Sequence, residues 1–137
     1  MPAERILRNP HEAAALAYGG LGVLVIVITF AAGLVPPTRE GAIWQATTGA
    51  GFVLVLAALL YWRGWWVLSA LLVVSNLWRT SNYAGHGLGL HLDPRTLSIS
   101  AIPPRPVAFV NAALMAVIVL LLARSAWIGF RAWCTRR

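Results

Sequence analysis

The stretch AAALAYGGLGVLVIVITFAAGLV, residues 13–35, decides the fold class of this chain of 137 residues. It holds 23 consecutive residues without a charged side chain. As an α-helix it would be about 35 Å long, which is enough to cross a hydrocarbon core of about 30 Å. Asn9-Pro10 precedes it as a helix cap and first helical residue, and Pro36 ends it. We therefore predict a membrane-spanning helix at about 10–35.

The composition also indicates a lipid environment. Hydrophobic residues make up 59% of the chain, above the roughly 45–50% of ordinary soluble domains. All eleven basic residues are arginines, and they separate the apolar runs instead of lining one helix, which is typical of membrane flanks and not of a nucleic-acid-binding surface. The single cysteine, Cys134, allows neither an internal disulfide nor a cysteine-based zinc motif. We expect contact with the lipid bilayer, no nucleic acid and no metal.

Three further apolar runs predict helices at about 42–62, 64–83 and 106–130. The third run is ambiguous because its uncharged part, Gly64–Trp78, has 15 residues and would be only about 22 Å long. Either the helix continues through Arg79, whose side chain would snorkel to the interface, or the segment is re-entrant. Continuation is the better interpretation because neither proline nor glycine intervenes before Gly85.

These helices define one transmembrane domain over residues 1–137, an all-α integral membrane protein with a four-transmembrane-helix bundle. Arg63-Gly64 marks a tight hairpin, and an outer loop rich in glycine and proline covers about 84–105. If the N-terminus is cytoplasmic, seven arginines lie inside and four outside. We therefore expect a multi-pass protein of the cell membrane, of the bacterial inner membrane, with both termini cytoplasmic. The tryptophans, which lie near the predicted helix ends, agree with these limits.

One face of the first helix carries small residues, which let helix backbones approach closely in lipid. They are Ala15, Gly19, Gly22, Thr29 and Gly33. This face is suited to packing, either against a helix of another protein or against the chain's own helices. The second interpretation is the stronger, because glycine is common in membrane helices.

A few polar side chains lie inside the apolar runs: Asn76, Asn111, Ser69, Thr47 and Thr48. An unpaired amide is costly in hydrocarbon, so each asparagine needs a partner. We expect the two asparagines to lie at similar depth and to pair with each other, the alternative being a ligand or a partner chain. In a transporter or channel, all five side chains would line the path.

His86 and His91, followed by Asp93, are the best candidates for ligand binding, because imidazole ligates metals and a carboxylate orients it. Their spacing matches no compact zinc signature, however, so hydrogen-bonded or solvated histidines are the simpler interpretation. His11 begins a helix, where the dipole disfavours an imidazolium, and we assign it no role. The sequence identifies no cofactor.

The chain carries no recognisable nucleophile, P-loop or dinucleotide motif, so we expect no enzyme and no catalytic residue. The hypothesis that follows is a non-catalytic accessory subunit that packs against a larger membrane protein complex. A small homo-oligomeric transporter or channel is one alternative. Another is a membrane redox subunit that binds a cofactor or pigment through His86, His91 or tryptophan.

Overall fold

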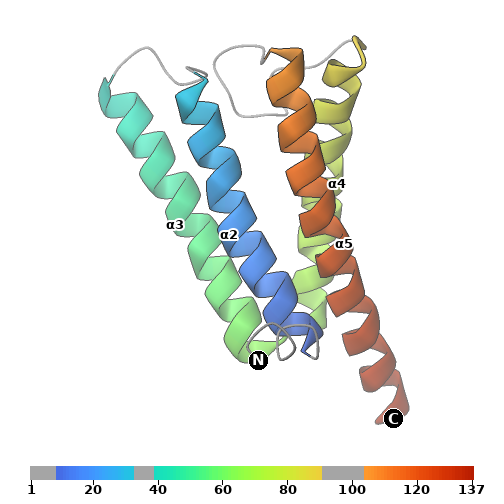
Figure 1. Ribbon diagram of the computed structural model, residues 1–137. Coiled ribbons are helices and arrows are strands. Elements are labelled where there is room, and N and C mark those ends of the chain that lie inside the picture. Colours follow the sequence, from blue (N-terminus) through green and yellow to red (C-terminus); the bar gives the residue numbers. More distant parts are fainter. Residues whose placement is uncertain (1–8, 33–38, 91–103) are drawn as a thin grey trace, which may run out of the picture.

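The computed structural model describes residues 9–32, 39–90 and 104–137. Four α-helices make up this part of the chain: α2 (Pro10–Ala31), α3 (Arg39–Arg63), α4 (Trp66–Gly87) and α5 (Arg105–Thr135). They run alternately in opposite directions, so that each begins near the end of the molecule at which its predecessor ends (Figure 1). The predicted all-α class is confirmed.

Three of these helices are long and apolar enough to cross a membrane, namely α2, the Ile43–Arg63 part of α3, and α5. The chain is therefore a membrane protein. Within the described residues, α4 does not reach the same apolarity, since it carries Asn76 and Arg79 among other polar residues. The prediction of four transmembrane helices is thus supported for three of them.

The helix boundaries follow local signals. The Asn9 side chain accepts hydrogen bonds from the backbone N–H groups of His11 and Glu12, at 3.1 and 3.3 Å, and Pro10 occupies the first turn of α2. This is the predicted cap. At the hairpin between α3 and α4, Gly64 has a φ of 59°, a conformation that favours glycine.

The other limits differ from the prediction by a few residues. α2 ends at Ala31, whereas the expected helix ran to 35, and residues 33–38 are outside the described part. α3 begins three residues before the expected residue 42, with Glu40 in the first turn, where the helix dipole favours a negative charge. α4 continues four residues past 83, into the predicted loop, and α5 continues five residues past 130. The third run is one continuous helix, as expected.

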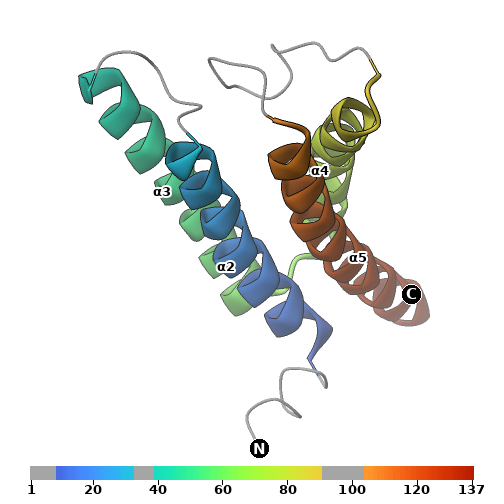
Figure 2. The ribbon, with the colours of Figure 1, turned by 45° about the horizontal axis from the view of Figure 1, so that its top comes forward.

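The four helices do not close into a ring. α4 packs most extensively on α5, α2 packs on both α5 and α3, and α3 and α4 share no comparable interface. Figure 2 shows the result as two helix pairs, α2–α3 and α4–α5, that diverge toward the end where α3 begins. This arrangement leaves room between α3 and α4.

The core is concentrated toward the opposite end. A cluster there joins α2, α3, α4 and α5 through side chains that include Ala14, Leu60, Leu72 and Leu122. Ala14, Leu60 and Leu122 have no exposed surface. A smaller cluster around Tyr83 and Met115 joins α4 to α5 nearer the other end.

An aromatic cluster lies beside the end of α5. The Trp66 ring centroid is 5.4 Å from that of Phe130 and 5.9 Å from that of Trp133. The guanidinium of Arg137 lies 4.3 Å from the Trp133 ring centroid, a cation–π distance. Tryptophan and arginine together are typical of a membrane interface, so this cluster marks the end of the membrane-embedded part of α5.

Close packing of α5 on α4 depends on one glycine. A Cβ atom at Gly129 would collide with the Cβ of Trp66 and would lie 3.3 Å from the His11 ring. Since the Trp66 Cβ is fixed to its backbone, it cannot move aside without shifting α4. At Gly20, by contrast, an added Cβ would meet nothing within 4 Å.

We predict that Gly129→Ala lowers the free energy of unfolding by about 1–3 kcal/mol, the usual cost of overpacking. Gly20→Ala is the matched control and should leave stability unchanged or slightly raised, because alanine favours the helix. Denaturant unfolding of the purified variants in detergent, followed by circular dichroism, measures both. Equal stability of the two variants would contradict the packing described above.

Candidate functional site

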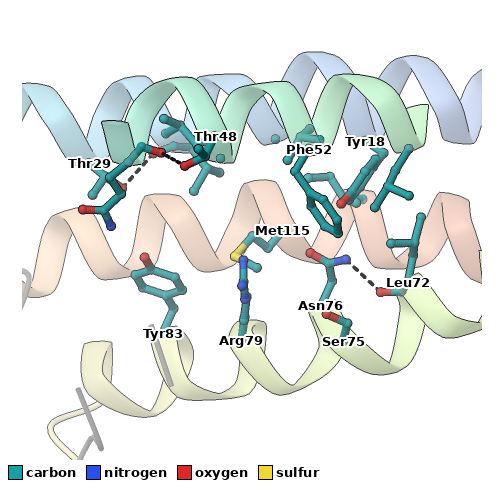
Figure 3. Close-up of a pocket in the computed structure, with 18 of the residues that line it drawn as sticks. Tyr18, Thr29, Thr48, Phe52, Leu72, Ser75, Asn76, Arg79, Tyr83 and Met115 are labelled. Carbon is teal, nitrogen blue, oxygen red and sulfur yellow. Dashed lines mark hydrogen bonds between the residues drawn. The ribbon is translucent and has the colours of Figure 1, made fainter. Parts of the chain in front are cut away.

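A cavity of about 470 Å³ lies between the two helix pairs. Its volume is within the range of about 300–1,000 Å³ that is usual for small-molecule sites. All four helices contribute to its wall, with Tyr18 and Thr29 from α2, Thr48 and Phe52 from α3, Asn76, Arg79 and Tyr83 from α4, and Met115 from α5. Figure 3 shows the α4 side chains extending toward the α2–α3 pair. The cavity lies where α3 and α4 do not pack, so it adjoins the surface that faces lipid.

The wall of the cavity is mainly apolar and carries polar groups along its whole length. Toward the start of α3, it holds Thr29, Thr48 and Tyr83, all at one end of the view in Figure 3. Further along, Phe52 and Leu72 line it beside the polar side chains of Tyr18, Ser75 and Asn76. A largely apolar cavity with several polar groups suits an amphiphilic molecule.

Among the described residues, Arg79 is the only charged side chain that lines this cavity. It lies eight residues before the last residue of α4, or about 12 Å along the helix from that end. The side chain is directed between the helices (Figure 3) and keeps exposed surface, so its snorkelling to the interface stays a prediction. Tyr18 and Tyr83 line the same cavity. Within the part of the chain that the structure describes, Arg79 makes neither an ion pair nor a hydrogen bond.

The expected pair of asparagines does not form. The Asn76 side chain donates to the backbone carbonyl of Leu72 in its own helix at 2.8 Å. Asn111 is fully buried, and neither of its polar atoms makes a hydrogen bond of normal geometry, although the Tyr83 hydroxyl interacts with Asn111 and Thr29. Counted along their helices, Asn76 lies about 16 Å and Asn111 about 9 Å from the shared end, so the two amides differ in depth.

The hydroxyl groups of Thr47 and Thr48 form hydrogen bonds within their own helix. Thr47 donates to the Ile43 carbonyl at 2.8 Å, Thr48 to the Trp44 carbonyl at 2.7 Å. Thr48 lines the cavity, whereas Thr47 does not, and Ser69 lies apart from both. The five polar residues considered as a transport path are therefore not brought together along one path.

Ser69 belongs instead to a buried chain of hydrogen bonds. The Nδ1 atom of His11 lies 2.7 Å from the Ser125 hydroxyl, which lies 2.9 Å from the Ser69 hydroxyl. Both serines have no exposed surface. The chain joins α2, α5 and α4 at the core end of the molecule, and Gly64 and Gly129 leave space for the imidazole. Assigning no role to His11 was therefore wrong, because its ring links three helices.

The small-residue face of α2 packs inside the molecule. A Cβ atom at Gly19 would lie 3.1 Å from the Ala57 Cβ, and one at Gly22 would lie 2.9 Å from a Val53 methyl. Ala15 is buried in the core. Thr29 lines the cavity and donates to the Val25 carbonyl at 2.8 Å. Gly33 is outside the described residues. Within the part described, this face serves the contact of α2 with α3.

Of the histidine group, His86 lies in the last turn of α4, while His91 and Asp93 are outside the described residues. The described residues hold no group of three His, Cys, Asp or Glu side chains placed to bind a metal ion. Comparisons of the chain with protein-family models, curated proteins and solved structures give no match. The cavity and the His11 chain, neither of which the sequence pattern indicated, are thus the features on which function is argued.

We predict that Ser125→Ala lowers the free energy of unfolding by about 1–2 kcal/mol, because it leaves His11 and Ser69 without their shared partner. Ser81→Ala is the matched control, since the exposed Ser81 hydroxyl bonds only to the Leu77 carbonyl of its own helix. The same detergent unfolding measurement compares them. If the two variants have the same free energy of unfolding, the buried chain of hydrogen bonds does not stabilise helix packing.

Proposed function

We propose that the protein is a non-catalytic, four-span membrane protein that takes up an amphiphilic molecule from the bilayer into the cavity between α3 and α4. The observation that carries this proposal is a cavity whose mainly apolar wall also holds polar side chains and a guanidinium, beside a gap between two helices. An amphiphile dissolved in the bilayer reaches such a gap without leaving lipid.

The length and position of α4 support four spans. With 22 residues it is about 33 Å long, close to the thickness of a hydrocarbon core. Its polar side chains Asn76 and Arg79 line the cavity, and Asn76 is buried while Arg79 keeps exposed surface. Because both side chains border the space between the helices, a membrane crossing by α4 is compatible with its composition. The arginine asymmetry supports cytoplasmic termini.

We predict that reporter fusions at Arg63 and Pro94 report opposite sides of the membrane, Arg63 the cytoplasm and Pro94 the outside. α4 lies between these two positions, so only a crossing by α4 separates them. A paired alkaline phosphatase and fluorescent-protein reporter measures the compartment at each position. The same compartment for both would remove the fourth span.

The core end of the molecule argues for binding and against conduction. Beyond the Leu72 end of the cavity, Leu60 and Leu122 fill the space between the helices and have no exposed surface. The His11–Ser125 contact follows them along the helices. The cavity therefore suits a molecule that enters and leaves on one side.

A second candidate is the accessory subunit. In α3, 6% of the apolar window is buried, against 33% in α2 and 39% in α5. α3 also has its main contact with α2 alone. A helix held on one side leaves most of its surface for lipid or for a helix of a partner complex.

We predict that the protein, purified from its native membrane in a mild neutral detergent, retains an amphiphile that mass spectrometry detects. Ser75→Phe should remove it, since Ser75 lines the cavity and the ring would fill it. Ser81→Phe is the matched control on the same helix, because Ser81 does not line this cavity. Retention by all three forms would place the amphiphile elsewhere. A stoichiometric foreign protein without an amphiphile would favour the accessory subunit.

A further inference from the structure

We propose that the molecule held in this cavity carries an oxyanionic head group, a carboxylate or a phosphate, and that Arg79 binds it. This inference rests on the proposed uptake of an amphiphile and adds the chemistry of its head group. The observation behind it is a guanidinium that faces the cavity and makes no ion pair or hydrogen bond with the residues that the structure describes.

The charge of Arg79 needs an anion. A guanidinium remains protonated in proteins, and a charge at membrane depth is costly unless it is paired or hydrated. The described acidic residues are Glu12 and Glu40, each in the first turn of its helix, and neither pairs with Arg79. Because no described side chain neutralises Arg79, an anion from outside the protein is the favoured partner.

The geometry around Arg79 suits an oxyanion. A guanidinium donates hydrogen bonds in a planar fork that matches a carboxylate or a phosphate. Tyr18 and Tyr83 line the same cavity, and a phenol hydroxyl donates a hydrogen bond to an anion. Thr48 contributes less, because its hydroxyl proton is already given to the Trp44 carbonyl.

The apolar side chains of the cavity accommodate the chain of the ligand. From Arg79, the wall continues along Phe52, Leu56 and Leu72 toward the core. A cavity of about 470 Å³ has the size of a small-molecule site, so a single-chain amphiphile is the ligand we assign. Its head group lies at Arg79 and its chain beside these three side chains.

The test measures equilibrium binding to the full chain in phosphatidylcholine nanodiscs, at a pH alkaline enough to ionise a fatty acid. Three radiolabelled probes share one acyl chain: palmitate, palmitoyl lysophosphatidic acid and uncharged monopalmitoylglycerol. Unlabelled inorganic phosphate, an anion without a chain, is added as a competitor. The protein forms are the natural chain, Arg79→Gln, Arg79→Lys and Arg63→Gln, the last removing an arginine that does not line the cavity.

We expect Arg79→Gln to weaken binding of the anionic probes by about ten- to a hundredfold, the effect of losing a charge-assisted hydrogen bond. Monopalmitoylglycerol binding should be unchanged, Arg79→Lys should retain part of the anion affinity, and Arg63→Gln should match the natural chain. Inorganic phosphate should not compete.

The outcomes separate the two proposals. If the natural chain binds the uncharged probe as well as the anionic ones, and Arg79→Gln changes none of them, the head-group assignment is wrong while uptake stands. If no probe binds the natural chain, both proposals fail. Full competition by inorganic phosphate would show that the site holds a free anion, which overturns the assignment of an amphiphile. The elution profile of each variant confirms that it is folded.

Discussion

Every polar group inside a bilayer must find its partner within the protein, and this constraint governs the whole arrangement. Hydroxyl groups such as that of Thr47 satisfy it by bonding to the carbonyl one turn earlier in the same helix. His11, Ser125 and Ser69 satisfy it by bonding across three helices. Where no described residue meets the constraint, the side chain lies between helices: Asn111 is fully buried there, and Arg79 lines the cavity while keeping exposed surface.

The same constraint explains why α4 differs from its neighbours. A helix that faces lipid on most of its surface, as α3 does, needs apolar residues all round. α4 packs along α5 and borders the cavity, so polar side chains such as Ser69 and Asn76 are buried there. Part of its lower apolarity is thus a consequence of where it packs, whereas Ser75, Arg79 and Ser81 keep exposed surface.

The sequence predicts what depends on local signals. Asn9-Pro10 locates the start of α2, and Gly64 locates the hairpin between α3 and α4. The lengths of the uncharged runs predict the three apolar spans. It does not predict what depends on how the helices are placed against one another. His11 and Ser125 are 114 residues apart, and nothing in either neighbourhood indicates their contact. The direction of Arg79 likewise follows from the gap beside α4, which hydropathy does not report.

The close approach of α2 and α3 at Gly19 and Gly22 has a mechanical consequence. Because α3 has its main contact with α2 alone, fewer contacts resist a change in its tilt than in the other helices. Bilayer thickness acts on a helix through its tilt. Of the four helices, α3 is therefore the one whose tilt we expect to follow the thickness of the bilayer most closely.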